Sequence, residues 1–429
     1  MGWPVAKKRV SSLSGVPQPA IAAHDSLSGL GGVLEKARDL QDRTVALRRR
    51  IHRFPELGLD LPATKQAILD ELADLHLAIR HATRTSAMVA VLEGGRPGPT
   101  VLLRGDMDAL PLQEQTGLEF SSERNGIMHA CGHDTHVAML ASAARLLAGA
   151  RDQLAGRVAF FFQPGEEGFH GAREALREGL LGGEGRDAAG HQIAGAFALH
   201  ISATYRSGEV LVRPGPMLAS AVRFVARSQG RGGHASEPHA ALDPIPVAAE
   251  VVLALQSMVT RRVNIFDPAV VTVGRISAGT TDNIIPDVAE LEGTMRTLSD
   301  ATRADVRRRI RQVLDGITAA HDTTATFELF EGYPVTVNDE AAAAQVTTVA
   351  TEMFGEDSVV ELAAPIMGAE DWSYVLQQHP GAMAFLGACP PDVDVQNAVP
   401  DHSNMVVFDE DAFPVGVALH AAMAMRWLS

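Results

Sequence analysis

The chain has 429 residues, and 37 Lys and Arg against 52 Asp and Glu give it a formal net charge of −15 at pH 7. Hydrophobic residues make up 46% and charged residues 21% of the chain, which is ordinary for globular proteins and excludes wholesale disorder. At about 150 residues per domain, this length predicts two or three domains.

The charge and cysteine content exclude several classes of protein. An acidic chain is a poor partner for nucleic acid, because phosphate binding needs clustered Lys and Arg. The short basic clusters at residues 48–50 and 307–309 fall in helical patterns, so we expect them to be solvated helix faces. Residues 1–30 are too polar for a signal peptide and are interpreted as a loose tail. With only two cysteines and no apolar run near the about 20 residues of a membrane span, we expect a cytoplasmic protein without membrane partners.

Helical and strand-like patterns alternate along most of the chain. Residues 34–52 have the spacing of one amphipathic helix. Short apolar runs follow, separated by helical patterns such as residues 134–149, and each run ends in a polar cluster; the runs are residues 100–104, 157–163 and 193–199. Such runs are typical of strands buried on both faces, and their alternation with helices predicts an α/β fold with a mostly parallel sheet.

Over residues 217–330 the strand and helix patterns follow a different order, which predicts a smaller domain inserted into the larger one. Four strand patterns and two helical patterns follow one another in the order β-α-β-β-α-β, which is typical of a ferredoxin-like unit. Pro and Gly mark both borders, near residues 214–216 and 332–334. The expected domains are therefore a catalytic domain of residues 31–216 and 331–429, and an inserted domain of residues 217–330.

Metal-binding residue types stand where the apolar runs end. Cys131 and His133 are two residues apart at the start of a helical pattern, whose N-terminus favours the ligating thiolate. Glu166 and Glu167 follow the second run, and adjacent carboxylates can divide metal binding from proton transfer. His200 follows the third run. Because ligands bind beyond the carboxyl ends of parallel strands, these residues together predict a metal site.

Each of these features has an ordinary alternative. A single His at a strand end is usually a polar residue with satisfied hydrogen bonds, paired Glu residues are usually surface charge, and a free Cys is often a small core residue. A rival enzyme would use Cys131 as the nucleophile with a His as its base. A non-catalytic metal-dependent binding protein is a third class. The chain lacks a Gly-x-Ser-x-Gly elbow, a Walker loop and a His-Glu-x-x-His sequence, which disfavours serine hydrolases, NTPases and zincins.

From about residue 47 to the C-terminus, the chain resembles the M20 metallopeptidase family. It is most similar to the amidohydrolase branch, which hydrolyses N-acyl amino acids, hippurate and auxin conjugates. The motifs that carry the resemblance are RRRIHRFPELG (48–58), RGDMDALP (104–111), HACGHD (129–134), QPGEEG (163–168), LH (199–200), GRGGHAS (230–236), DNIIPD (282–287), LEGTMRT (291–297) and MGAEDWSY (367–374).

The resemblance implies a site with two divalent metal ions. Cys131 would bridge the ions, and the other ligands would be His133, Glu167, His200 and His402. Zinc suits these donors best, although manganese, cobalt or nickel are compatible. Glu166 would be the general acid/base, and Asp108 would orient a ligand histidine. Asp106 is not expected to be a ligand.

The resemblance also assigns roles to the inserted domain. It would form a homodimer, and His234 would reach the partner's active site and stabilise an oxyanion. Asn283 and Arg296 would hold the carboxylate of the substrate, a small N-acyl amino acid. The expected reaction is amide hydrolysis to a carboxylic acid and a free amino acid. A dipeptidase or aminoacyl peptidase of the same family is the nearest alternative.

Overall fold

The computed structural model describes Lys7–Lys8 and residues 29–429. Apart from Lys7–Lys8 and the start of the first helix, the expected tail of residues 1–30 lies outside the described part of the chain. The chain forms two compact units, and each is described by itself. Of the described residues, the first unit contains those up to Met217, with Val337–Ala364 and Tyr374–Ser429, and the second contains Leu218–Thr336 and Pro365–Ser373.

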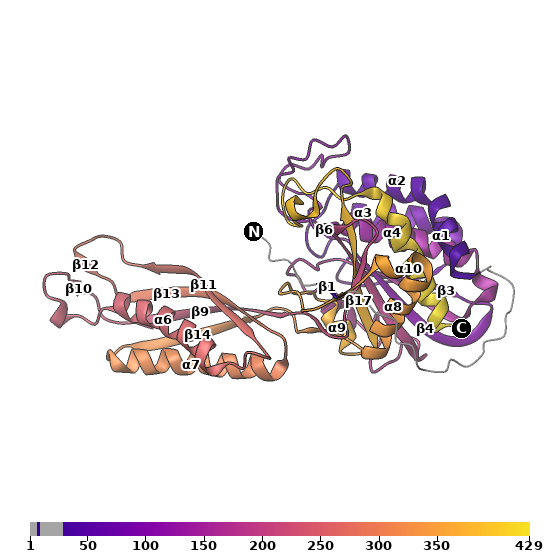
Figure 1. The fold of residues 1–429 in the computed structure, drawn as a ribbon. Coiled ribbons are helices and arrows are strands. Elements are labelled where there is room, and N and C mark those ends of the chain that lie inside the picture. Colours follow the sequence, from indigo (N-terminus) through magenta and orange to yellow (C-terminus); the bar gives the residue numbers. More distant parts are fainter. Residues whose placement is uncertain (1–6, 9–28) are drawn as a thin grey trace. The chain divides into compact units, whose positions relative to one another are not determined.

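A nine-stranded sheet forms the centre of the first unit (Figure 1). Its central strands β17, β6, β4 and β5 are parallel, whereas β3 and β2 are antiparallel at one edge. This arrangement confirms the predicted α/β fold class. In spatial order the strands are β1 (Lys7–Lys8), β16 (Val359–Leu362), β7 (Val210–Val212), β17 (Gly381–Cys389), β6 (Ile193–Arg206), β4 (Arg96–Asp106), β5 (Ala155–Gln163), β3 (Met88–Glu93) and β2 (Ala78–His81).

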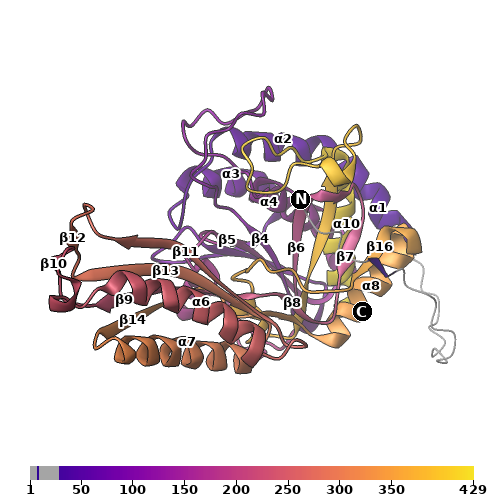
Figure 2. The same cartoon turned by 60° about the vertical axis from the view of Figure 1, so that its left-hand side comes forward.

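Helices pack against this sheet through alternate residues of its strands. In β4, Val101 and Leu103 belong to the core shared with the helices, whereas Leu102 points to the other face. Helix α4 contacts both α2 and α10 and is buried over almost its whole length (Figure 2). The helices are α1 (Gly29–Asp39), α2 (Gln41–Arg53), α3 (Pro62–Leu72), α4 (His133–Ala148), α5 (Gly171–Arg177), α8 (Glu340–Phe354), α9 (Ser373–Leu376) and α10 (Phe413–Trp427).

Two local predictions for the first unit were wrong. The single helix expected over residues 34–52 is two helices, because α1 ends at Asp39 and α2 begins at Gln41, with Leu40 as its N-cap. The strand expected to end at residue 199 continues to Arg206, because β6 keeps its pairing with β17 past the apolar run. His200 therefore lies inside a strand.

The second unit is a four-stranded antiparallel sheet with two helices. Its strand order β11-β13-β9-β14, with α6 after β9 and α7 after β13, is the expected ferredoxin-like arrangement. Asp243 and Ser299 cap the two helices by accepting hydrogen bonds from the backbone N–H of Ile245 and Thr302. The elements are β9 (Ser220–Gln229), α6 (Pro244–Arg262), β11 (Ala269–Ala278), β13 (Val288–Thr297), α7 (Asp300–Ala320) and β14 (Thr324–Glu331).

Two further strand pairs are short. The pair β10 (Gly233–His234) and β12 (Ile284–Ile285) belongs to the second unit, and β8 (Gly215–Leu218) pairs with β15 (Thr336–Asn338) where the chain passes between units. The second unit also takes in residues 365–373, which the sequence did not indicate, so the exact domain limits stay a prediction. Within the described chain, every helix is too short or too polar to cross a membrane.

Candidate metal centre

The candidate metal ligands come from separate elements of the first unit that meet at one edge of its sheet. Cys131 and His133 stand at the start of α4, and Glu167 follows the end of β5. His200 projects from β6, and His402 comes from the loop before α10. This is the edge at which parallel strands present their carboxyl ends, where α/β proteins bind ligands.

The Cys131 sulfur lies at the centre of this group. Its Sγ atom is 3.4 Å from Nε2 of His200 and 3.3 Å from Nε2 of His402. His402 Nε2 is also 3.2 Å from Oε1 of Glu167, which in turn is 4.0 Å from Nε2 of His133. The structure thus brings together all five residues that the sequence indicated as metal ligands.

Hydrogen bonds made by Nδ1 determine that His133 and His200 turn Nε2 toward the other donor atoms. Nδ1 of His133 donates to the backbone carbonyl of Asp108 at 2.8 Å, and Nδ1 of His200 donates to the carbonyl of Ile201 at 2.5 Å. Nε2 of His200 therefore faces the Cys131 sulfur, and Nε2 of His133 lies 3.3 Å from Oδ2 of Asp106 and 4.0 Å from Oε1 of Glu167. Nε2 of His133 is fully buried and has no hydrogen-bond partner among the described residues. An unsatisfied buried nitrogen in such a setting is typical of a metal ligand.

The donor atoms form two groups that share Cys131. One contains Cys131, His133 and His200, and the other contains Cys131, Glu167 and His402; within each group the ligand atoms lie within 4.8 Å of one another. Zinc–sulfur and zinc–nitrogen bonds of about 2.3 and 2.0 Å place neighbouring tetrahedral ligands about 3.5 Å apart. The separations around the sulfur match that value, so the residues present fit two cations.

Charge supports the same conclusion. Burial, followed by the charges of Glu167 and Asp401, raises the pKa of the Cys131 thiol well above its usual value. Burial and the nearby carboxylates therefore favour the thiol, whereas the helix N-terminus was expected to favour the thiolate. Burial opposes protonation of His133, but Asp106, Asp108 and Glu167 outweigh it and raise its pKa to about 10. Both shifts reflect the carboxylates gathered around Cys131 and His133, whose negative charge a bound cation would offset.

Asp108 holds the two glutamates as well as a histidine. Its carboxylate oxygens accept hydrogen bonds from the backbone N–H groups of Glu166 and Glu167, at 2.9 and 3.0 Å. It was expected to orient a ligand histidine. The closer contact to His133 comes from its backbone carbonyl, since the carboxylate is 3.7 Å away. Glu166, the expected general base, is 6% exposed beside Glu167.

His402 reaches the site from an unusual backbone conformation. Its φ of 67° lies in the left-handed region, which non-glycine residues seldom adopt. Its backbone N–H donates to the carbonyl of Ala130 at 2.8 Å, which ties the loop to the segment carrying Cys131. Strained backbone of this kind is concentrated at functional sites.

The expectation that residues 48–50 form a solvated helix face is wrong for Arg48. Its side chain is 1% exposed and pairs with Asp134 at 2.8 Å and with Glu410 at 3.0 Å. Nδ1 of His52, one turn further along α2, contacts the same Asp134 oxygen at 2.8 Å. Because Asp134 follows His133 directly, this network fixes the start of α4 behind the candidate ligands.

The sequence did not indicate that Asp106 and His136 contribute to the site. Asp106 Oδ1 lies 2.6 Å from Nδ1 of His136, and Oδ2 pairs with Arg104 at 2.9 Å. Nε2 of His136 accepts a hydrogen bond from the backbone N–H of Ile201 at 2.8 Å. Since both nitrogens of His136 are used, it is not available as a ligand. Its position one turn after His133 on α4 was the available sequence signal.

The three candidate residues of the second unit fall into two places. His234 in β10 and Asn283 beside β12 are neighbours, because the N–H of Ala235 bonds to the carbonyl of Asn283 at 3.1 Å. His234 Nδ1 accepts from the N–H of Ser236 at 3.1 Å, so its exposed Nε2 carries the proton and can donate. Arg296 lies near the far end of β13, about 27 Å along the strand from Val288.

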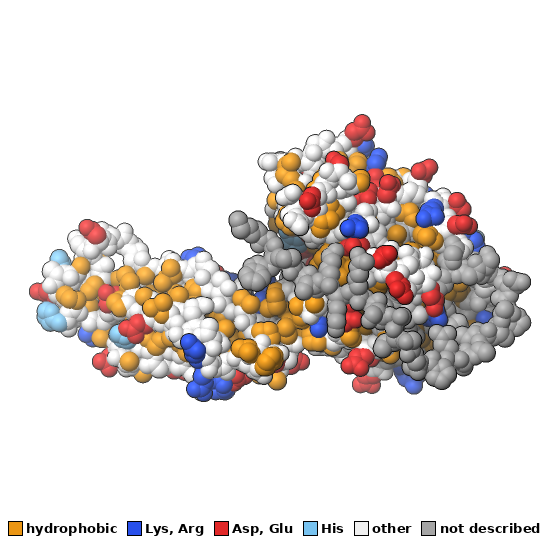
Figure 3. Space-filling model, viewed as in Figure 1, with side chains coloured by type: hydrophobic (Ala, Val, Ile, Leu, Met, Phe, Trp, Pro, Cys, Tyr) orange, Lys and Arg blue, Asp and Glu red, His pale blue; other side chains and the backbone are white. Residues whose placement is uncertain are grey.

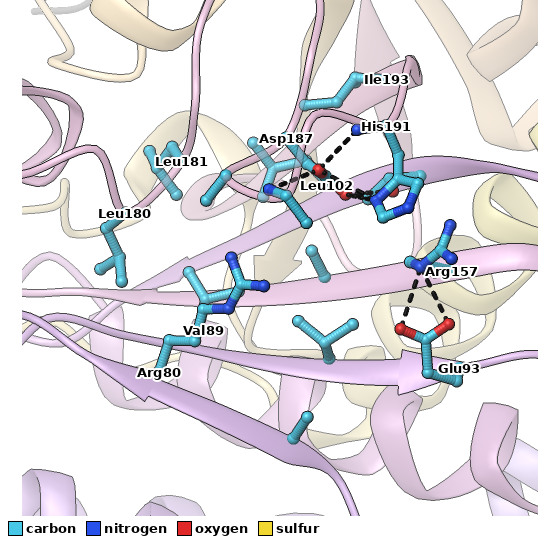
Figure 4. A pocket seen from close by; sticks show the side chains of 16 residues that line it. Arg80, Val89, Glu93, Leu102, Arg157, Leu180, Leu181, Asp187, His191 and Ile193 are labelled. Atoms are coloured by element: carbon cyan, nitrogen blue, oxygen red, sulfur yellow. Dashed lines mark hydrogen bonds and ion pairs between the residues drawn. The ribbon is translucent and has the colours of Figure 1, made fainter.

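A separate cavity lies on the other face of the sheet in the first unit. Figure 4 shows it between β2, β3, β4 and β5 and the chain around Asp187, and its volume is ≈ 70 Å³. Thr100 lines it, whereas Asp106, six residues later in β4, contacts the candidate metal centre. At about 3.3 Å per residue these positions are about 20 Å apart, so the cavity is not part of the metal centre.

An α/β unit with cysteine, histidine and carboxylate donors around a buried glutamate defines a metal-binding hydrolase. The chain belongs to peptidase family M20/M25/M40, whose family model matches residues 102–426. This finding confirms the predicted family and the prediction of a hydrolytic enzyme.

Similar proteins cover nearly the whole chain. Thermostable carboxypeptidase 1 of Saccharolobus solfataricus is 35% identical over 91% of this chain and 96% of its own length. N-acetyl-L-cysteine deacetylase of Bacillus subtilis is 37% identical over 81% of each protein. A solved Bacillus subtilis structure, described as a dinuclear metal-binding peptidase of the M20 family, is 31% identical with a TM-score of 0.78 and covers 91% of this chain and 99% of its own.

Proposed function

We propose that the protein hydrolyses the amide bond of N-acyl amino acids and releases a carboxylic acid and a free amino acid. The observation that carries this proposal is the convergence of five donor side chains, with Cys131 at their centre and Glu166 held beside them. The similarity to an N-acetyl-L-cysteine deacetylase supports this class of substrate.

Cys131, His133, Glu167, His200 and His402 would hold two divalent cations, which when bound lower the pKa of a coordinated water to about 7 and polarise the amide carbonyl. Glu166 takes the proton from the attacking water and passes it to the departing amine. The Asp108 carboxylate keeps Glu166 in place by accepting a hydrogen bond from the Glu166 backbone N–H. Thiolate and imidazole donors favour zinc, with manganese, cobalt and nickel as compatible ions.

The second unit would bind the substrate and stabilise the oxyanion. His234, with its Nε2–H exposed, can donate to a developing negative charge, and Arg296 can pair with a carboxylate. Burial lowers the pKa of Arg296, which has no ion pair with any described residue. Because His234 and Arg296 lie at opposite ends of one unit, the arrangement supports a site to which two copies of the chain contribute.

A second copy of the chain would pair with the second unit along β11. This edge strand exposes Val270 and Ile276, and the neighbouring helix α6 exposes Leu253, which is 69% exposed. Figure 3 shows hydrophobic side chains spread over the visible face of this unit. An unpaired edge strand with apolar side chains favours pairing with another strand, so we assign this edge to a homodimer.

A free, reduced Cys131 supports a cytoplasmic location.

An assay on metal-reconstituted protein tests the proposed function. We expect cleavage of N-acetyl and N-benzoyl amino acids in preference to dipeptides, with activity lost on chelation and restored by zinc or manganese. Glu166→Gln should lower kcat by about 10²–10⁴-fold and keep both cations, because Glu166 moves protons and does not ligate. Faster turnover of dipeptides would favour the peptidase alternative. Activity that survives chelation would favour Cys131 as a nucleophile and overturn the proposal.

A further inference from the structure

His136 is a buried histidine that joins three elements of the first unit. It lies on α4 and is fully buried, and its ring contacts the end of β4 and an interior residue of β6. Its Nδ1 is 2.6 Å from Oδ1 of Asp106 on β4, and its Nε2 is 2.8 Å from the backbone nitrogen of Ile201 on β6. One imidazole therefore links the strand that ends at Asp106 to the strand that carries His200.

The partners of His136 determine its tautomer. The backbone N–H of Ile201 can only donate, so Nε2 of His136 must be the acceptor. Nδ1 then carries the single proton and donates it to the carboxylate of Asp106. The ring is neutral and makes one directed hydrogen bond on each side, which leaves it little freedom to rotate.

Asp106 is a fixed acceptor for this bond. Its second oxygen, Oδ2, pairs with Arg104 at 2.9 Å, and Arg104 also donates to Oε1 of Gln163 at 3.0 Å. Arg104, Asp106 and Gln163 are all fully buried. Asp106, held by its ion pair with Arg104, therefore anchors His136 to β4, and its Oδ2 also lies 3.3 Å from Nε2 of His133.

The backbone of Ile201 connects His136 to the metal ligand His200. Its N–H is held by His136, and its carbonyl accepts the Nδ1–H of His200 at 2.5 Å. The packing here is tight, since a Cβ atom on Gly132 would come within 2.4 Å of Cγ2 of Ile201. A shift of the Ile201 peptide would therefore turn the His200 ring relative to Cys131, whose Sγ lies 3.4 Å from Nε2 of His200.

We propose that His136, anchored by Asp106, is the positioning residue for His200 and thereby sets the affinity of one of the two cation positions. The affected position is the one formed by Cys131, His133 and His200, whereas the position formed by Cys131, Glu167 and His402 does not involve Ile201. This inference rests on the proposed two-cation function. Residues that orient metal ligands typically contribute 10–100-fold to affinity.

The test compares matched variants by their zinc content and affinity. His136→Leu should weaken one of two zinc positions by about 10–100-fold, so that the dialysed protein keeps one zinc per chain. His420→Leu is the control, because His420 is also a fully buried helical histidine but has no hydrogen-bond partner among the described residues; it should keep two. His136→Gln, whose amide oxygen can still accept from the Ile201 N–H, should recover part of the lost affinity.

Cobalt provides a readout that does not depend on turnover. The visible absorption bands of cobalt reflect its ligand geometry, so His136→Leu should change the bands of one of the two bound ions and His420→Leu should leave both unchanged. If the His136→Leu chain does not fold, Asp106→Ala, which removes the oxygen that accepts from Nδ1 of His136, should show the same selective loss. Two zinc ions bound with unchanged affinity by a folded variant would overturn this inference alone. A wild-type protein that binds no divalent cation would overturn the proposed function as well.

Discussion

Buried histidines in this protein have opposite electrostatic environments. Burial lowers the pKa of His420 on α10 to about 3, and its ring packs edge-on against Phe197 with 5.3 Å between ring centroids. For His133 the surrounding carboxylates outweigh burial and raise the pKa to about 10. The imidazole of His420 therefore lies in an apolar environment, whereas that of His133 is surrounded by carboxylates.

His420 should make the folded protein sensitive to acid. In the unfolded chain its pKa returns to about 6.5, so below that pH the unfolded state binds a proton that the folded state does not accept until about pH 3. The free energy of unfolding should therefore fall as the pH falls through this window, by about 1.4 kcal/mol at pH 5.5 from this group. In urea unfolding, the free energy of unfolding of His420→Leu should therefore fall by that much less than that of the wild type between pH 7.5 and 5.5. An identical acid dependence in both proteins would contradict the assignment.

At the level of single residues, the sequence predicted the candidate metal ligands. It did not predict the residues that hold those ligands in place. Cys131, Glu167 and His200 could be named because their types and motifs carry their chemistry. His136 and Arg48 could not, because their roles come from partners 65 and 86 residues away in the chain, Ile201 and Asp134. A run of arginines on a helix looks the same in sequence whether the face it forms is solvated or buried.

At the level of elements, α2 combines both kinds of arginine environment. Arg48 is buried against Asp134 on α4, whereas Arg50 is about half exposed and pairs with Asp70 on α3. The boundaries of helices and strands were predicted less well than their existence. The apolar pattern that predicts β6 ends at residue 199, but backbone pairing with β17 extends the strand to Arg206.

Arg48→Met and Arg50→Met are a matched pair of substitutions on this helix. Removing Arg48 leaves the charge of Asp134 buried without its guanidinium, which should lower the free energy of unfolding by about 3–5 kcal/mol. Removing Arg50 breaks an exposed ion pair, which contributes little, so the unfolding midpoint should stay close to that of the wild type. Urea denaturation followed by circular dichroism measures both. Equal effects of the two substitutions would show that the α2–α4 pair does not stabilise the fold.

At the level of the whole molecule, the two-unit organisation was predictable, because the order of strand and helix patterns changes along the sequence. Residues 365–373 were not predicted to join the second unit, because they are separated from it in the chain by β15, α8 and β16 and carry no strand or helix pattern that marks them. Their grouping depends on contacts formed only after folding. The relation between copies of the chain remains a proposal that oligomeric state can test.

Substitution at the two edges of the second unit's sheet tests the homodimer. Ile276 on β11 is 54% exposed and Phe330 on β14, at the other edge, is 44% exposed. Ile276→Lys should convert the dimer to monomer in sedimentation velocity, because a charge on an edge strand opposes pairing. It should also lower turnover if His234 acts across the dimer. Phe330→Lys should leave the dimer intact. A wild-type monomer, or a dimer unaffected by Ile276→Lys, would exclude β11 as the interface.

The central claim is that Cys131 joins two cation positions in one centre. Anomalous diffraction from crystals of the zinc-loaded protein tests it most directly. We predict two peaks about 3.5–4 Å apart. One should be bonded to Cys131, His133 and His200, and the other to Cys131, Glu167 and His402. A single peak, or zinc bound without the sulfur of Cys131, would contradict the account.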